Sequence, residues 1–187
     1  MAALADRSGP RVLDAPVVGT RQPAEQGALV VLASGDPALR PGVEPAFDAM
    51  GSRTLWAGDS LGSGSALRLA CNAWVATVTA GVAQSLSLAG AQHLDPRLFL
   101  DAIAGGQSDT PYAHLKGEAM LSGEFPAQFA LDGVVKDLGL IRTAIGDSGI
   151  DTVLVGALLD TFQCASEAGH GGEDIAAAVT AFRPAVG

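Results

Sequence analysis

The first third of the chain alternates short apolar runs with turn residues. The runs occupy residues 12–18, 28–33 and 53–56, and each is followed by glycine or by a turn that contains glycine and aspartate. This pattern is typical of sheet strands. Residues 38–50 have the length of a helix, and Gly51 predicts its end. Three strands and one connecting helix account for only part of an α/β sheet domain.

The pattern becomes helical after Gly62 and stays so to the end of the chain. Apolar residues at steps of three, four and seven predict one helix of roughly 27 residues, which is long enough to belong to more than one domain. Its apolar stripe comprises Leu67, Cys71, Trp74, Val75, Val78, Val82 and Leu86. Further helices are predicted at 95–103, 112–121, 127–146, 154–168 and 174–182. The chain is therefore expected to be α/β followed by all-α.

The long helix also has the length of a membrane span. No charged residue lies between Arg68 and Asp95, but polar residues such as Asn72, Thr77 and Gln84 interrupt the apolar sequence. Because lipid tolerates such interruptions poorly, we expect a soluble helix buried between protein layers.

Composition and charge narrow the classes of partner and the compartment. The net charge of −9 and the pI near 4.5 repel phosphate backbones and anionic lipid heads, so neither nucleic acid nor a membrane surface is an expected partner. Cys71 and Cys164 form no CxxC pair and predict buried free thiols in a reducing cytoplasm. The first eleven residues contain no continuous apolar segment of the kind found in secretory signals.

One segment matches a hydrolase signature. Residues 58–62 read G-x-S-x-G between a strand and a helix, the place of a nucleophilic serine, here Ser60. His170 with Asp151 or Asp160 would complete a triad. The hydrolase sheet needs parallel strands after this point, whereas the remaining sequence is helical, so a simple turn is the favoured interpretation.

Two other sites are excluded by spacing. Gly62 and Gly64 begin a G-x-G-x-x-G pattern, but Leu67 occupies the third glycine position, so this is not a dinucleotide fingerprint. His93 and His114 share no metal-ligand spacing with His170, and no metal site is predicted.

Three longer motifs occur in a recognisable order. Residues 14–20 read D-A-P-V-V-G-T, residues 64–72 read G-x-x-x-R-x-x-x-N, and residues 135–140 read V-K-D-L-G-L. They resemble the D-A-P-V-S-G-G, G-x-x-x-K-x-x-x-N and L-K-D-L-G-L segments of β-hydroxyacid dehydrogenases, a family that includes 3-hydroxyisobutyrate dehydrogenases and tartronate semialdehyde and glyoxylate/succinic semialdehyde reductases. The segments at 47–51, 94–96 and 167–171 fit the same family in the same order, so the resemblance covers almost the whole chain.

The resemblance implies a fold and a cofactor. Residues 1–62 would be the C-terminal remnant of an NAD(P)-binding Rossmann domain with a partial Rossmann-type sheet. Residues 63–187 would be a helical domain like that of 6-phosphogluconate dehydrogenase, starting with the long interdomain helix. The cofactor would be NAD or NADP, with Lys136 on its side of the cleft. Alternatively, Lys136 forms an i,i+4 pair with Asp132.

The same resemblance assigns a catalytic face to the long helix. The family transfers a hydride between nicotinamide and a carbon that bears a hydroxyl. Its acid/base lysine corresponds to Arg68, and its substrate-holding asparagine corresponds to Asn72. A guanidinium is effectively never deprotonated, so Arg68 can orient and polarise the substrate but exchanges protons poorly. Alternatively, Arg68 pairs with Asp14, with Asp59 or with a substrate carboxylate.

The backbone amides of Val18, Gly19 and Thr20 would, by resemblance, bind the substrate carboxylate, and the substrate would be a small hydroxyacid or aldehyde. Glycine permits the close approach and positive φ that such a turn needs. Val18 replaces the family's serine and Thr20 its second glycine, which leaves the identity of the substrate open.

Family members extend further at the N-terminus, where a glycine-rich loop holds the pyrophosphate. The chain is therefore expected to be N-terminally truncated, to expose a sheet edge and to bind NAD(P)H poorly. Two alternatives stay open: a non-catalytic helical dimerisation remnant, and imine reductase-like activity. A homodimer through the helical domain is expected in either case.

Overall fold

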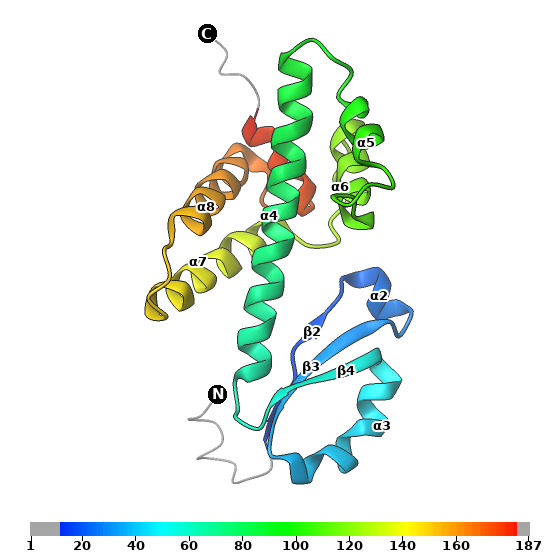
Figure 1. Ribbon diagram of the computed structural model, residues 1–187, viewed down its shortest axis with the longest axis vertical. Helices are drawn as coiled ribbons and strands as arrows, with labels where there is room; N and C mark the ends of the chain where they lie inside the picture. Colours follow the sequence, from blue (N-terminus) through cyan, green and yellow to red (C-terminus); the bar gives the residue numbers. More distant parts are fainter. Residues whose placement is uncertain (1–11, 183–187) are drawn as a thin grey trace. The chain divides into compact units, whose positions relative to one another are not determined.

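The computed structural model describes residues 12–182, which divide into two compact units between Cys71 and Asn72. Helix α4, Ser63–Ala91, contributes residues to both units (Figure 1).

The first unit contains a mixed four-stranded sheet. Its strands are β1 (Leu13–Asp14), β2 (Val17–Val18), β3 (Leu29–Gly35) and β4 (Gly51–Gly58). Strands β1 and β2 pair antiparallel with opposite ends of β3, whereas β4 pairs parallel with β3 along almost its whole length. β3 is therefore the central strand, and its residues 31–35 are buried.

The opening strand differs from its prediction. The expected continuous strand at 12–18 is interrupted at Ala15 and Pro16, and its two pieces run antiparallel to β3. Proline has no N–H to donate to a ladder, which explains the interruption. The Pro16 carbonyl still accepts a hydrogen bond from the Leu32 N–H at 2.8 Å, so both pieces stay on the same edge.

Short helices complete the first unit. The predicted helix at 38–50 is present as the 3₁₀ turn η1 (Pro37–Leu39) followed by α3 (Arg40–Met50), whereas α2 (Arg21–Glu25) was not predicted. Phe47 of α3 packs on Val31 and Ala33 of β3, and this cluster is the core of the unit.

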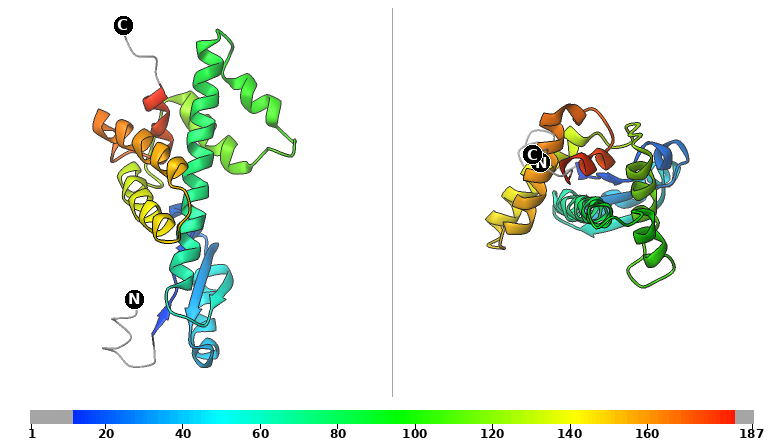
Figure 2. Two further views of the ribbon diagram at one scale, coloured as in Figure 1. Left: turned by 60° about the vertical axis from the view of Figure 1, so that its left-hand side comes forward. Right: turned by 90° about the horizontal axis from the view of Figure 1, so that it is seen from above.

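The second unit consists of helices. They are α5 (Arg97–Ile103), α6 (Pro111–Ser122), α7 (Leu131–Asp147), α8 (Val153–Ala165), the π-helical η2 (Ser166–His170) and the 3₁₀ helix η3 (Ile175–Phe182). Helix α8 contacts α7, η2 and η3, and the two views in Figure 2 show α7 and α8 side by side.

Two predicted helices differ from the structure at one end, and a third differs in type. Helix α7 begins at Leu131, later than expected, because Gln128 and Phe129 donate their N–H groups to the Asp174 carboxylate instead of starting a helix. Helix α8 ends at Ala165, and the π turn that follows contains Gly169 at φ 101°, a left-handed conformation that ends a regular helix. The last helix is 3₁₀ rather than α.

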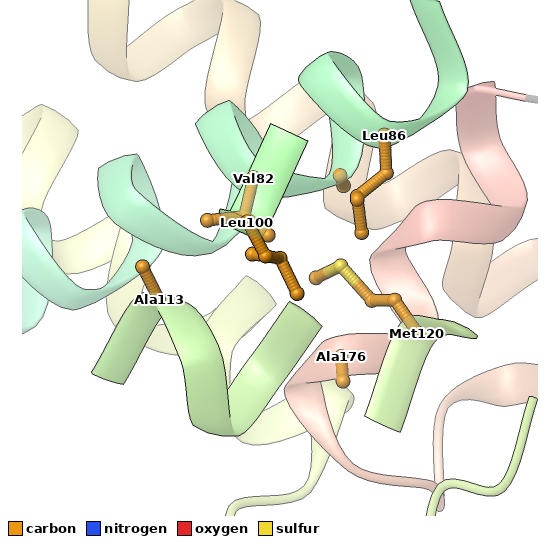
Figure 3. Packing of buried hydrophobic residues seen from close by; sticks show 7 residues of the cluster. Val82, Leu86, Leu100, Ala113, Met120 and Ala176 are labelled. Carbon is orange, nitrogen blue, oxygen red and sulfur yellow. The ribbon is translucent and has the colours of Figure 1, made fainter. Parts of the chain in front are cut away.

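The core of the second unit forms where α4, α5, α6 and η3 meet. Val82 and Leu86 of α4 pack with Leu100, Met120 and Ala176 (Figure 3). The predicted apolar stripe is therefore only partly correct, because Trp74 is 62% exposed and Leu67 is also exposed. Cys71 is a half-buried and Cys164 an exposed free thiol, in contrast to the buried thiols that were expected.

Helix α4 is, within the described residues, the one helix with the length and apolar composition of a membrane span. Only 28% of its apolar window is buried in this structure. This is a smaller share than we expected for a helix covered by protein layers.

A buried ion pair joins α6 to Asp174, the residue before η3. The Lys116 Nζ donates to Asp174 Oδ1 at 2.7 Å, and both side chains are almost completely buried. The same carboxylate accepts the N–H groups of residues 128, 129 and 176. Because each of these donors is satisfied by one side chain, Asp174 fixes three chain segments at once.

Candidate active site

The first turn of α4 is anchored on the sheet of the first unit. The Gly64 N–H donates to Ser34 Oγ at 3.0 Å, and the Ser65 N–H donates to Asp14 Oδ2 at 2.7 Å. A Cβ on Gly64 would collide with the Leu32 carbonyl, so only glycine permits this approach. Since residues four apart share a helix face, this anchor defines the side of α4 that carries Arg68.

Arg68 is exposed and forms no ion pair with any carboxylate in residues 12–182. The two acids considered as its partners are engaged elsewhere. Asp14 accepts from Ser65 and Ser34, and Asp59 pairs with Arg40 at 2.8 Å. The guanidinium of Arg68 is therefore accessible to a ligand.

Asn72, one turn further along α4, is held by a residue that we did not predict. Its Nδ2 donates to Asp137 Oδ2 at 2.8 Å, and Asp137 is buried. The Lys136 Nζ lies 3.2 Å from the other oxygen of the same carboxylate, while the rest of this lysine side chain is 72% exposed. Asp137 thus connects the predicted substrate-side residue Asn72 to the predicted cofactor-side residue Lys136.

A sequence signal for Asp137 was present. It directly follows Lys136 within the 135–140 motif, and it falls on the apolar face of α7 between Val134 and Leu138, both of which are buried. A charged residue on a buried face requires a partner. The alternative pair of Lys136 with Asp132 is not formed, since Lys136 pairs with Asp137 and Asp132 accepts from the Ser166 hydroxyl at 2.6 Å.

The turn at residues 18–20 has the expected backbone. Gly19 has φ 135°, in the left-handed region that favours glycine, and Thr20 precedes α2 without a side-chain cap. Val18 ends β2 opposite Val30. Among the described residues no hydrogen bond joins this turn to Arg68, so the substrate role of Val18, Gly19 and Thr20 stays a prediction.

The other candidate groups have local partners. Ser60 lies in the turn before α4, and its carbonyl accepts the Ser63 N–H. His170 bonds to Glu173 at 2.7 Å. The Gly105 N–H, together with His114, holds the pKa of Asp109 below its usual range. The described part of the chain contains no cluster of three metal-binding side chains.

Comparison with known proteins places these residues in a family. The sequence profile described as the NAD-binding domain of NADP-dependent 3-hydroxyisobutyrate dehydrogenase matches residues 62–182, which is more than half of the chain. The chain belongs to the β-hydroxyacid dehydrogenase family. The profile of the NAD-binding domain of 6-phosphogluconate dehydrogenase also matches, over residues 1–58.

Individual members of the β-hydroxyacid dehydrogenase family and other relatives are similar to almost the whole of this chain. Glyoxylate/succinic semialdehyde reductase 2 of Arabidopsis thaliana is 29% identical over 95% of this chain and 49% of its own length. The cytokine-like nuclear factor N-PAC of Homo sapiens is 30% identical over 93% of this chain and 31% of its own length. The crystal structure of 3-hydroxyisobutyrate dehydrogenase from Salmonella typhimurium is 27% identical, with a TM-score of 0.86, covering 96% of this chain and 63% of that one.

The chain spans about half the length of the plant reductase and under a third of N-PAC. Its fold is nevertheless that of the β-hydroxyacid dehydrogenases, with the NAD(P)-binding sheet region followed by the helical domain. NAD(P) is the cofactor of this family.

Proposed function

We propose that this chain forms the substrate side of an NAD(P)-dependent oxidoreductase that transfers a hydride between nicotinamide and a small hydroxyacid or semialdehyde. The observation that carries the proposal is the arrangement on α4. Arg68 is unpaired among the described residues, and Asn72, on the same face, is held by the buried Asp137. Residues 1–62 would belong to the nucleotide-binding domain, and residues 63–187 would form the helical domain.

Arg68 and Asn72 have different tasks in this proposal. The guanidinium polarises the substrate carbonyl and stabilises the alkoxide that forms after hydride transfer. It does not exchange its own proton, so the alkoxide takes a proton from solvent, which reaches the exposed Arg68. The Asn72 Nδ2 is committed to Asp137, which leaves its oxygen to accept a substrate hydroxyl.

When bound, nicotinamide supplies or accepts the hydride. The chain contributes Lys136, whose exposed ammonium is available to the cofactor. The sequence contains no G-x-G-x-x-G turn to hold a pyrophosphate. Calorimetric titration measures the affinity of this polypeptide for NADPH.

Substitution of Arg68 tests the catalytic role. With glyoxylate or succinic semialdehyde as substrate and NADPH absorbance as the readout, Arg68→Ala is expected to lower kcat/KM about 100-fold or more, because one charge-stabilising donor is lost. Arg68→Lys restores the family residue and is expected to retain turnover. Arg142→Ala, a change of another exposed arginine on α7, serves as the control. Unchanged turnover in both Arg68 variants would refute the role.

A second candidate function is a non-catalytic dimerisation module. Trp74 and Leu88 are about 60% exposed on α4, and Gly81, midway between them, leaves open space where a side chain would stand. The three positions are seven residues apart, the spacing of a helix seam. We propose that this face, in either candidate function, meets a second copy of the chain. N-PAC carries the name of a nuclear factor rather than of an enzyme, which supports the non-catalytic alternative.

A further inference from the structure

Helix α4 has an unusual N-terminal cap, because both capping residues come from strands rather than from the preceding loop. Asp14 lies on β1 and Ser34 on β3, and the two residues face each other in the antiparallel register. Both are almost completely buried. An ordinary cap is a residue next to the helix, whereas Asp14 is separated from Ser65 by 51 positions in the sequence.

The contacts of the cap are shared between the two residues. Asp14 Oδ2 accepts the Ser65 N–H at 2.7 Å, and its Oδ1 accepts the Ser65 hydroxyl at 2.7 Å. Ser34 Oγ accepts the Gly64 N–H and donates to Asp14 at 3.3 Å. Two free N–H groups of the first turn are thus satisfied by the sheet. The negative carboxylate also lies at the positive end of the helix dipole.

This cap is directly connected to the substrate-side face. Gly64 and Arg68 are four residues apart and lie on the same face of α4, and Gly64 is the residue pressed against the Leu32 carbonyl. A rotation or shift of the first turn would therefore displace the base of Arg68 by the same amount. The cap fixes the rotation of the helix as well as its position, since Asp14 binds both the backbone and the side chain of Ser65.

We propose that Asp14 is a positioning residue for the reaction, acting through the Ser65 cap to hold Arg68 in place. The inference rests on the proposed function of Arg68. It assigns to Asp14 a role other than that of a direct partner of Arg68, because both of its oxygens are engaged by Ser65 and Ser34.

Four variants of the protein test this proposal. Asp14→Asn places an amide N–H or a weaker acceptor against the donors of Ser65, and Ser65→Ala removes only the hydroxyl contact. Ser65→Thr keeps the hydroxyl and is the rescue variant. Ser63→Ala, two residues away and outside the cap, is the matched control.

Two readouts are compared. Hydrogen exchange in peptides covering residues 62–72 is expected to accelerate about 10-fold in Asp14→Asn and Ser65→Ala, because each variant loses or weakens a contact of the cap. It is expected to stay unchanged in Ser65→Thr and Ser63→Ala. In Asp14→Asn and Ser65→Ala, kcat is expected to fall about 10- to 100-fold while KM stays near the wild-type value, because a misplaced group impairs the reaction more than binding.

The outcomes separate the two proposals. Unchanged kcat in Asp14→Asn and Ser65→Ala, with an active wild type, would overturn the positioning role and leave the proposed function intact. A parallel rise of KM with no change in kcat would also overturn it. A wild type without turnover would refute the proposed function, and the positioning of a catalytic Arg68 with it, whatever the exchange rates show. If Asp14→Asn does not fold, the Ser65 pair decides.

Discussion

Tyr112 shows how burial changes the chemistry of a single residue. Burial raises its pKa to about 12, and the nearby Asp174 carboxylate acts in the same direction, while hydrogen bonding with Thr79 offsets part of the effect. Lys116, buried beside the same ring at 5.6 Å from its centroid, is paired with Asp174. This polar cluster joins α6 to the residue that precedes η3.

We predict that the tyrosine titrates near pH 12 in the native protein and near pH 10 after unfolding in urea. Because the folded state holds the tyrosine proton more tightly than the unfolded state does, protonated Tyr112 contributes about 2 to 3 kcal/mol to the free energy of unfolding. This contribution is fully present below pH 10 and is lost as the pH rises through 12. The chain has one tyrosine, so absorbance at long ultraviolet wavelength reports Tyr112 alone. Equal midpoints in the two states would contradict the prediction, and Tyr112→Phe gives the background signal.

At the scale of elements, α4 determines where the two candidate site residues lie, because it carries Arg68 and Asn72 and is anchored at one end by the sheet. Gly64 makes the anchor possible, since its missing Cβ is the space that the Leu32 carbonyl occupies. Asp137 of α7 provides a second fixed point within the other unit. Helix α4 is thus held at Gly64 within one unit and at Asn72 within the other.

We predict that Gly64→Ala destabilises the protein by about 1 to 3 kcal/mol, the usual cost of forcing an extra carbon into a packed contact. Gly139→Ala on α7 is the matched control. Its Cβ would meet no atom within 4 Å, and alanine is the better helix former, so a gain of up to about 1 kcal/mol is expected. Urea unfolding measures both changes. A Gly64→Ala protein as stable as the wild type would show that the close approach is not required.

At the scale of the whole molecule, the exposed apolar face of α4 is a surface that a second copy of the chain could cover. Trp74 and Leu88 lie on a helix of which 28% of the apolar window is buried. Large apolar residues that repeat along one helix face are characteristic of an interface. This is the structural basis for the expected homodimer.

We predict that Trp74→Glu converts the dimer to a monomer, because a buried unpaired carboxylate would be placed in the interface. Light scattering during size-exclusion chromatography measures the mass. Leu115→Glu on α6, at a position with the same degree of exposure, is the control and is expected to leave the dimer intact. A monomeric wild type, or a Trp74→Glu protein that stays dimeric, would disprove this interface.

The sequence by itself determined the features that depend on local pattern. From it we could predict the length of α4, the strands β3 and β4 and the helix ends at glycine. The motifs at 14–20, 64–72 and 135–140 were readable as well, and with them the family. These features follow from neighbours along the chain, whose spacing is fixed by helix and strand geometry.

Tertiary structure decided what depends on residues distant in sequence. Asp14 appeared to be a candidate partner of Arg68 and is instead the cap of α4, because β1 brings it opposite Ser34. Asp137 became the partner of Asn72 across 65 positions. Helix α7 begins late because Asp174 takes the N–H groups before it. A carboxylate binds the donors that the fold brings to it, and local sequence does not reveal which donors these are.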